Sequence, residues 1–258
     1  MANLTSISRS NPIKRRRVGI LGGMGPAATV DLMQKIIDAT PATCDQEHVP
    51  VIVWNVPQIP PRVPAIVGVA ESPEPAMREG ARWLAASGAE AIVIACNTAH
   101  HWAAAVESAA QRPLIHIADA ALSALSQSSA RRVMLLATVG TIKTGFYAQR
   151  FVAKGLALET PDAADQESVT TAIAQVKAGR IDSARAGLVP VLQRMAEQGV
   201  DAFLLACTEL PIVVRGTPFE AKSVDATEAL ARAIVAFSLD IDNTQTGGAI
   251  LQHGDQVA

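Results

Sequence analysis

A weak internal repeat constrains the fold of this chain more than any other feature of its sequence. Residues 18–25 (VGILGGMG) align with residues 133–140 (VMLLATVG), 115 positions further on. Residues 91–98 (AIVIACNT) resemble residues 202–208 (AFLLACT), 111 positions further on. Two similar offsets in the same order indicate a duplicated structural unit, so the two halves should have the same fold and face each other.

Short apolar runs alternate with helical segments in both copies. The expected strands share an apolar core bounded by turn residues, and they cover residues 18–21, 51–54, 91–95, 133–137, 156–159 and 202–206. Strands that alternate with helices form βαβ units with parallel strands. Entirely apolar strands are typical of parallel sheets that are covered on both faces. We therefore predict two similar α/β domains with parallel sheets.

Two of the helical segments carry specific predictions. The segment that starts at Cys96 should form a helix that ends near Gln111. The segment 181–198 contains Pro190 in its interior. Proline lacks the backbone N–H that an interior helix position uses, so this second helix should be kinked or split there.

Composition narrows the classes of protein to which the chain can belong. Of its 258 residues, 49% are apolar and 18% are charged, which suits a globular protein with a sizeable core. A net charge of −2 gives no case for binding nucleic acid, which needs a basic face. No apolar run approaches the roughly 20 residues that span a bilayer, so no membrane partner is expected.

The three cysteines provide neither a disulfide framework nor a CxxC motif for a metal or redox site. Free thiols in a reducing compartment are the simplest interpretation, which makes the expected location cytoplasmic. Cys96 and Cys207 occupy matching positions of the repeat, whereas Cys44 has no counterpart and is interpreted as a bystander.

The expected domain boundaries follow from the repeat. Residues 15–117 together with residues 225–240 should form the first α/β domain, and residues 118–224 the second. Residues 1–14 are expected to be a flexible extension, because the basic cluster after them directly precedes a strand. Residues 241–258 are largely polar and contain glycine, which is typical of a flexible tail.

Cys96 and Cys207 each follow an apolar strand directly. Ligands of parallel α/β sheets bind outside the carboxyl ends of the strands, so both thiols should face a cleft between the halves. The helix after each thiol should lower its pKa and favour the thiolate. A thiolate and a thiol on opposite sides of a substrate can remove a Cα proton from one face and deliver a proton to the other. The pair therefore predicts racemisation.

A racemase without a pyridoxal cofactor has to stabilise the carbanion that forms at Cα, and hydrogen-bond donors on the substrate α-carboxylate can do so. Asn97 and Thr98 follow the first cysteine, and Thr208 and Glu209 follow the second. Both pairs lie at expected helix starts, where backbone N–H groups are free. These residues are therefore candidates for binding the carboxylate or the ammonium group of the substrate.

Several segments together resemble the aspartate/glutamate racemase family, and in particular its branch of aspartate racemases and broad-specificity amino-acid racemases. The matching segments are residues 19–29 (GILGGMGPAAT), 45–50 (DQEHVP), 57–62 (PQIPPR), 95–100 (ACNTAH), 140–147 (GTIKTGFY), 176–179 (VKAG) and 206–210 (ACTEL). The resemblance implies a two-domain fold with pseudo-twofold symmetry, an active site in the interdomain cleft, no cofactor or metal ion, and a homodimer.

The resemblance also implies roles for individual residues. It assigns catalysis to Cys96 and Cys207. The residues expected at the substrate are Met24, Gln58, Arg62, Asn97, Thr98, Thr141, Lys177, Thr208 and Glu209. Among these, Arg62 and Lys177 would recognise a side-chain carboxylate, since arginine offers a bidentate fork and lysine a point charge. Glu209 would orient or tune Cys207, or complement the helix dipole.

One departure from the family concerns the loop that usually reads Pro-Asp-Arg, because this chain has Pro60-Pro61-Arg62 there. Losing the acidic neighbour changes how Arg62 is held. The expected substrate is aspartate first and glutamate second, and the alternative is a broad-specificity racemase of other amino acids. A decarboxylase, an isomerase and a non-catalytic amino-acid-binding protein are further alternatives, and the two cysteines favour racemisation over decarboxylation.

Two other patterns have competing interpretations. Residues 23–28 (GMGPAA) fit a relaxed dinucleotide-binding pattern, but the next strand ends in Trp54-Asn55 instead of an acidic residue that would hold a ribose. His100 and His101 could be metal ligands, but adjacent side chains on a helix point about 100° apart. We expect His100 to support the Cys96 loop and His101 to be exposed.

Overall fold

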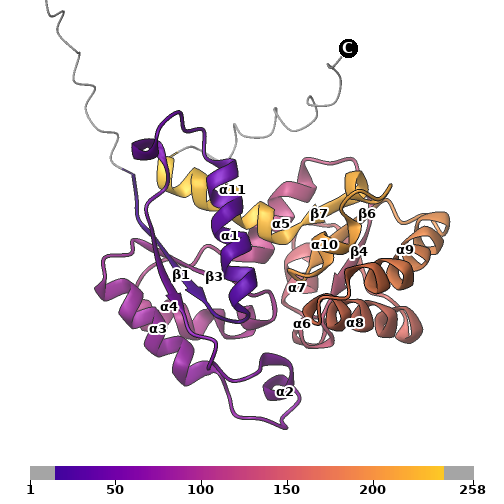
Figure 1. Cartoon of the computed structure of the whole chain (residues 1–258), viewed down its shortest axis with the longest axis horizontal. Coiled ribbons are helices and arrows are strands. Elements are labelled where there is room, and N and C mark those ends of the chain that lie inside the picture. Colours follow the sequence, from indigo (N-terminus) through magenta and orange to yellow (C-terminus); the bar gives the residue numbers. More distant parts are fainter. Residues whose placement is uncertain (1–14, 241–258) are drawn as a thin grey trace, which may run out of the picture.

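The computed structural model describes residues 15–240, so the expected flexible segments 1–14 and 241–258 lie outside the described residues. Two sheets of parallel strands lie side by side, each covered by helices (Figure 1). This arrangement confirms the predicted fold class of two similar α/β units with parallel sheets.

The first sheet has the strand order β2–β1–β3. Its strands are β1 (Val18–Gly22), β2 (Val51–Asn55) and β3 (Ala91–Ile94). The helices around it are α1 (Pro26–Ala39), α2 (Arg62–Ile66), α3 (Glu74–Ala86) and α4 (Ala103–Ala110), with the 3₁₀ helices η1 (Asp45–Glu47) and η2 (Thr98–Trp102).

The second sheet has the strand order β5–β4–β6–β7 and follows α5 (Ile117–Ser126). Its strands are β4 (Arg132–Ala137), β5 (Ala157–Glu159), β6 (Ala202–Ala206) and β7 (Ser223–Asp225). The helices around it are α6 (Val139–Thr144), α7 (Phe146–Val152), α8 (Ala163–Lys177), α9 (Ile181–Glu197) and α10 (Leu210–Val214), with the 3₁₀ helix η3 (Glu220–Lys222). The last helix, α11 (Ala226–Leu239), follows β7.

The strand pairing reproduces the sequence repeat residue by residue. In the first sheet, Val18 of β1 lies opposite Ala91 of β3. In the second sheet, Val133 of β4 lies opposite Ala202 of β6. These are the four residues that begin the aligned segments, so the two halves have the same register between their corresponding strands.

Alternate residues of each strand pack into different cores, which explains why the strands are apolar throughout. Ile20 of the first sheet and Leu135 of the second belong to one core that both halves share. Leu21 packs in a separate core formed with α3 and α4, and Leu136 in another formed with α8, α9 and α10. Both faces of each sheet are therefore buried, as the apolar strands predicted.

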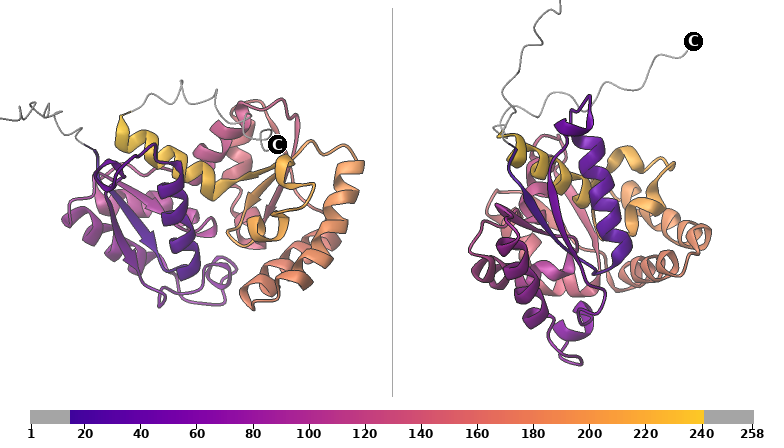
Figure 2. Two further views of the ribbon diagram at one scale, coloured as in Figure 1. Left: turned by 45° about the horizontal axis from the view of Figure 1, so that its top comes forward. Right: turned by 60° about the vertical axis from the view of Figure 1, so that its left-hand side comes forward.

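Helix α11 connects the two halves. It follows β7, the edge strand of the second sheet, and packs against α1 of the first half and against α5. Figure 1 and Figure 2 show it in yellow, extending from the second sheet across to the side of α1. The shared core lies between these helices and the two sheets.

Two helices differ from the expectation. The segment after Cys96 is not one helix, because it begins as η2 and only Ala103 starts α4. The expected split at Pro190 is also absent, because α9 runs through this residue. Pro190 and Ala186 are both exposed, so water can bind the carbonyl group that loses its helical partner.

Candidate functional site

Cys96 and Cys207 line the same cavity at the carboxyl ends of β3 and β6, with a volume of about 200 Å³. Residues from both halves form its wall: Met24, Pro61, Arg62, Val63, Pro64, Cys96, Asn97, Thr98, Thr138, Lys177, Cys207, Thr208 and Glu209. Parallel sheets bind ligands at this edge, so the cavity is the candidate site.

Cys207 is buried and donates a hydrogen bond from Sγ to Oε2 of Glu209, at 2.9 Å. Burial, and next the negative charge of Glu209, raise the pKa of the Cys207 thiol well above its ordinary value. The prediction that the following helix lowers the pKa of the thiol and favours the thiolate is therefore wrong for Cys207. The following helix, α10, spans only Leu210–Val214, and its dipole does not outweigh burial and the carboxylate.

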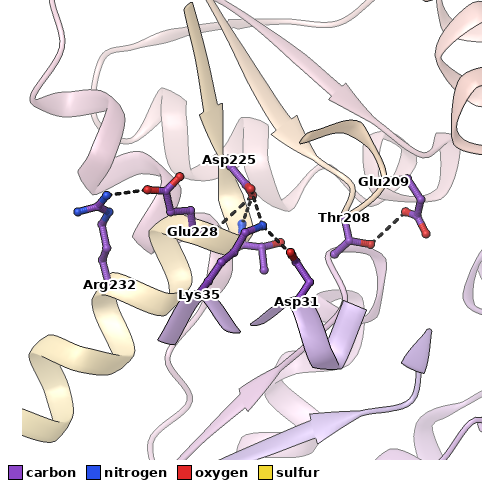
Figure 3. Close-up of polar contacts among 8 residues, drawn as sticks. Asp31, Lys35, Thr208, Glu209, Asp225, Glu228 and Arg232 are labelled. Carbon is purple, nitrogen blue, oxygen red and sulfur yellow. Dashed lines mark hydrogen bonds and ion pairs between the residues drawn. The ribbon is translucent and has the colours of Figure 1, made fainter. Parts of the chain in front are cut away.

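Glu209 joins three polar groups of the cavity wall. Besides the Cys207 thiol, its Oε2 accepts a hydrogen bond from Oγ1 of Thr208, at 3.0 Å, as Figure 3 shows. Its Oε1 lies 3.8 Å from Nζ of Lys177. Because the Lys177 side chain is 60% exposed, this ion pair is screened by water and contributes little to stability.

The backbone of Cys96 is held by a buried histidine. Nδ1 of His100 donates to the Cys96 carbonyl oxygen at 2.9 Å, and Nε2 of His100 accepts from the backbone N–H of Ile117 at 3.2 Å. Burial, and next the neighbouring His116, lower the pKa of His100 well below its ordinary value. A neutral ring with its proton on Nδ1 satisfies both contacts, so His100 supports the Cys96 turn as predicted.

Asn97 contributes a buried amide to the cavity wall. Its Oδ1 accepts a hydrogen bond from the Tyr147 hydroxyl at 2.6 Å. Within residues 15–240, its Nδ2 has no hydrogen-bond partner although it is buried. Buried amide donors are almost always paired, so an unpaired one on a residue of the cavity wall is a candidate for binding a ligand.

Three threonine hydroxyls form a triangle between the two halves. The Oγ1 atoms of Thr98, Thr138 and Thr141 lie 3.0 Å from one another. Thr98 and Thr138 line the cavity, whereas Thr141 lies behind them and is buried. Thr141, which the sequence placed at the substrate, therefore supports two residues that line the cavity.

Arg62 connects the two loops on one side of the cavity. Its Nη1 donates to the carbonyl oxygens of Ile59 and Pro60, at 3.1 and 2.9 Å, and its Nη2 donates to that of Met24, at 3.1 Å. Much of the donor capacity of the guanidinium is therefore directed at the protein's own backbone. The loops are also in close contact at Gly23, where a Cβ atom would lie 2.4 Å from the Val56 backbone.

Most of the residues that the sequence predicted at the substrate line this cavity. Besides Thr141, Gln58 is an exception, and several residues of the site were not predicted. Gln58 is exposed and is not part of the cavity wall. Sequence reasoning missed Pro61, Val63, Pro64, Thr138 and the supporting Tyr147. Pro61 lies within the matched segment 57–62, Val63 and Pro64 directly follow it, and Tyr147 lies in the matched segment 140–147. Position in or beside the motifs was therefore the only available signal.

In the part of the chain from residue 15 to residue 240, no three histidine, cysteine, aspartate or glutamate side chains are grouped so that they could bind a metal ion. His101 is exposed, as predicted, and does not share a site with His100. Among the described helices, none combines the length and the apolar character that crossing a membrane requires.

Comparison with known proteins identifies the family. Residues 21–234 match the model of the Asp/Glu/Hydantoin racemase family, and the chain belongs to this family. The structure is similar to that of an aspartate racemase from Picrophilus torridus, with 34% sequence identity, a TM-score of 0.78, and coverage of 86% of this chain and 94% of the other.

Two curated relatives add to this comparison. The broad-specificity amino-acid racemase RacX of Bacillus subtilis is 26% identical over 223 residues, which cover 85% of this chain and 96% of the relative. A glutamate racemase of Pseudomonas paraeruginosa is 32% identical over 179 residues, which cover 66% of this chain and 63% of the relative. The resemblance noted in the sequence is thereby confirmed at the level of the family.

Proposed function

We propose that this chain is a cofactor-independent amino-acid racemase that exchanges the Cα proton through Cys96 and Cys207. The observation that carries the proposal is that both thiols, each directly after a strand, line one cavity. Its volume of about 200 Å³ suits a substrate of amino-acid size. Drug-sized ligands typically occupy about 300–1,000 Å³.

The proposed reaction needs one thiolate and one thiol. In one direction, the Cys96 thiolate removes the proton from Cα, and the C–H electron pair stays on the substrate as a carbanion. The Cys207 thiol then donates its proton to that electron pair from the opposite face. Product release leaves Cys96 as the thiol and Cys207 as the thiolate, which is the starting state for the other enantiomer. The hydrogen bond from Cys207 to Glu209 supports Cys207 as the proton donor of the first direction.

The carbanion would be stabilised through the substrate α-carboxylate. The unpaired Nδ2 of Asn97 is the best-positioned donor, since it is buried in the cavity wall. Thr98 and Thr208 line the same cavity and contribute hydroxyl groups close to it. Donors that are fixed before the reaction stabilise developing negative charge without having to reorganise. Glu209, the carboxylate of the wall, would orient Cys207.

We propose aspartate as the first substrate and glutamate as the second. The cations Arg62 and Lys177 line the cavity and can attract a side-chain carboxylate. The similar Picrophilus torridus protein is an aspartate racemase, which supports the same choice. The two residues would therefore act on substrate specificity, while the cysteines carry out the proton transfer.

A broad-specificity racemase is the second candidate, and the contacts of Arg62 favour it. Three hydrogen bonds from this guanidinium end on backbone carbonyls of the two loops. Pro61, Val63 and Pro64 give the adjoining wall an apolar character that suits neutral side chains. The similarity to RacX, a broad-specificity enzyme, points in the same direction.

Proton exchange in D₂O tests the proposed reaction. The purified protein is incubated without cofactor with L-aspartate, and separately with L-glutamate. Deuterium at Cα is followed by NMR, and the enantiomers are separated by chiral chromatography. We expect exchange and racemisation in the wild type. Cys96→Ala and Cys207→Ala should each abolish racemisation, because the remaining thiol can exchange the proton on one face only. Cys44→Ala should leave both reactions unchanged, because Cys44 is exposed and outside the cavity. Racemisation that survives in Cys96→Ala or Cys207→Ala contradicts the two-cysteine mechanism.

The two substrate candidates differ in their response to Arg62→Lys and Lys177→Ala. If the cations bind a side-chain carboxylate, kcat/KM for aspartate and glutamate should fall about tenfold while that for alanine is retained, because hydrogen bonds to charged groups are worth about 1.5–3 kcal/mol. If Arg62 only joins the loops, Arg62→Lys should lower kcat/KM for all three amino acids alike. The substrate profile of each variant therefore decides between the candidates.

A homodimer and a cytoplasmic location are further proposals. The homodimer is what the resemblance to the aspartate/glutamate racemase family implies, and free cysteines support the location. Light scattering coupled to size-exclusion chromatography should give a mass of twice the 27.0 kDa of one chain. A mass of one chain at micromolar concentration contradicts the homodimer.

A further inference from the structure

Tyr147 makes a contact with the site that the proposed proton transfer does not require. Its ring is buried in the shared core, and its hydroxyl donates to Oδ1 of Asn97 at 2.6 Å. This is the one hydrogen bond that the structure records for the Tyr147 hydroxyl within residues 15–240. Burial, and next the charge of Asp225, raise the pKa of Tyr147 above its ordinary value, so the hydroxyl keeps its proton and remains a donor.

The position of Tyr147 is fixed by its neighbours. The rings of Phe146 and Phe151 lie 4.9 and 6.5 Å from its ring, between centroids, and both belong to the same core. Tyr147 comes from α7 of the second half, whereas Asn97 follows β3 of the first half. The contact therefore couples the amide in the cavity wall to the packing of the opposite half.

The orientation of an asparagine amide determines what it offers to a ligand. Oδ1 and Nδ2 have nearly the same shape, so a rotation by half a turn exchanges an acceptor for two donors. A substrate carboxylate needs donors, and an amide that presents Oδ1 instead would repel it. Asn97 is only 4% exposed, so water does not compensate for the wrong orientation.

We infer that Tyr147 is a positioning residue for substrate binding: its hydroxyl holds Oδ1 of Asn97 so that Nδ2 faces the cavity and binds the α-carboxylate of an amino acid. This inference rests on the proposed function. It accounts for two observations together, namely the short hydrogen bond on one side of the amide and the unpaired buried donor on the other. Tyr147 itself does not line the cavity.

Tyr147→Phe tests the inference because it removes the hydroxyl and keeps the ring. The probes are L-aspartate and L-isoasparagine, its α-carboxamide, and their dissociation constants are measured by calorimetry. We expect Tyr147→Phe to weaken L-aspartate about tenfold, which corresponds to about 1.4 kcal/mol, and to leave L-isoasparagine unchanged. Equal weakening of both ligands, or no weakening of L-aspartate, overturns the inference.

Two further variants separate positioning from a general structural effect. Asn97→Ala should lose the same preference for the carboxylate, and Tyr147→Phe added to Asn97→Ala should cause no further loss, because both changes remove one interaction. Phe151→Leu is the matched control in the same helix and core. It should lower the melting temperature and retain the preference of the wild type for L-aspartate over L-isoasparagine. An additive loss in the double variant contradicts the inference.

A spectroscopic measurement on the wild-type sequence does not depend on any variant. Tyr147 is the only tyrosine of the chain, so 3-fluorotyrosine labelling gives a single ¹⁹F resonance. We expect acetate and L-aspartate to shift this resonance, and acetamide and L-isoasparagine to leave it in place. A resonance that responds to neither carboxylate overturns the inference.

The binding measurements also distinguish this inference from the proposed function. They need no turnover, so a protein that binds the α-carboxylate through the Tyr147–Asn97 pair but does not racemise any amino acid contradicts only the proposed function. A protein that racemises aspartate normally after Tyr147→Phe, with an unchanged KM, contradicts only the inference about Tyr147.

Discussion

At the scale of single residues, burial and the contact with Glu209 together disfavour ionisation of the Cys207 thiol. The thiolate is opposed first by burial and then by the carboxylate 2.9 Å away. Glu209→Gln removes the negative charge, so the pKa of Cys207 should fall toward its ordinary value. The thiolate fraction at a fixed pH below that pKa then increases. We expect alkylation of Cys207 by iodoacetamide at pH 8 to become about tenfold faster, which corresponds to about one pKa unit.

The same molecule contains the control for this measurement. Cys44 is exposed and does not line the cavity that contains Glu209, so its alkylation rate should be equal in the wild type and in Glu209→Gln. Mass spectrometry of the separate peptides gives both rates. If the Cys207 rate does not increase relative to the Cys44 rate, Glu209 does not control the thiol.

Sequence reasoning found the residues of the site that lie directly after strands, but not every site residue within the family motifs. It could not foresee Tyr147, because the contact with Asn97 spans 50 residues and depends on how α7 packs in the shared core. It was wrong about the thiolate at Cys207 for a related reason. Helix dipoles are visible in a sequence, whereas burial and the direction of the Glu209 side chain are properties of the folded chain.

At the scale of elements, strands were predicted more accurately than helices. The apolar runs fixed β1, β3, β4 and β6 to within a residue or two, because each strand is buried on both faces. The helix after Cys96 was harder to predict, since its first turn is 3₁₀ and has no side-chain cap. Asn97 stands at the capping position, but its side-chain oxygen accepts from Tyr147 instead. The hydrogen bond with Tyr147 thus takes the place of the side-chain cap that asparagine usually provides at a helix start.

Helix α9 should become more stable when Pro190 is replaced. Pro190→Ala restores an N–H donor for the carbonyl of Ala186, and proline is about 3 kcal/mol less favourable than alanine inside a helix. The stiffness that proline gives the unfolded chain offsets about 0.4–1 kcal/mol of this. Because the site is exposed, water can bind the free carbonyl and reduces the gain further. We expect the free energy of unfolding in urea to increase by about 1–2 kcal/mol, without a change in substrate binding.

Gly187→Ala in the same helix separates the gain in helix propensity from the gain of the restored hydrogen bond. A Cβ atom at Gly187 meets no other atom within 4 Å, so this variant gains helix propensity alone. We expect a gain of about 0.5–1 kcal/mol, less than that of Pro190→Ala. A Pro190→Ala variant that is no more stable than Gly187→Ala shows that the missing hydrogen bond has no cost in α9.

At the scale of the whole molecule, the two halves share a core that the sequence repeat does not reveal. The repeat predicted equivalent sheets, but the shared core arises where α1, α5, α7 and α11 meet between them. We propose that residues 15–117 with residues 225–240 form one domain and residues 118–224 the other. The packing of α11 on α1 supports the assignment of the last segment to the first half.

A buried ion pair connects helix α1 to the end of strand β7. Nζ of Lys35, on α1, lies 2.6 Å from carboxylate oxygens of both Asp31 and Asp225, as Figure 3 shows. Asp225 ends β7, and its side chain also accepts from the backbone N–H groups that start α11. The side chains of Lys35 and Asp225 are only 13% and 11% exposed, so water does not replace either partner.

Removing Lys35 should therefore destabilise the whole molecule, because Asp225 would remain as a buried charge without a cation. We expect Lys35→Met to lower the free energy of unfolding in urea by about 3 kcal/mol. Lys35→Met combined with Asp225→Asn should recover most of this loss, since asparagine still caps α11 and carries no charge. Arg232→Met, which breaks the half-exposed Arg232–Glu228 pair in Figure 3, should cost at most about 0.5 kcal/mol.

The pH dependence of the unfolding free energy is a second test of the ion pair between Lys35 and Asp225. Burial alone would lower the pKa of Lys35, but the charges of Asp225 and Asp31 raise it above its ordinary value. A raised pKa in the folded state means that the stabilisation is complete below the pKa of the unfolded chain, about 10.4, and is lost as the pH rises through the folded value. The difference in unfolding free energy between the wild type and Lys35→Met should thus be constant near neutral pH and shrink above about pH 10.4. A difference that already shrinks between pH 7 and pH 9 assigns the loss of stability to groups other than Lys35.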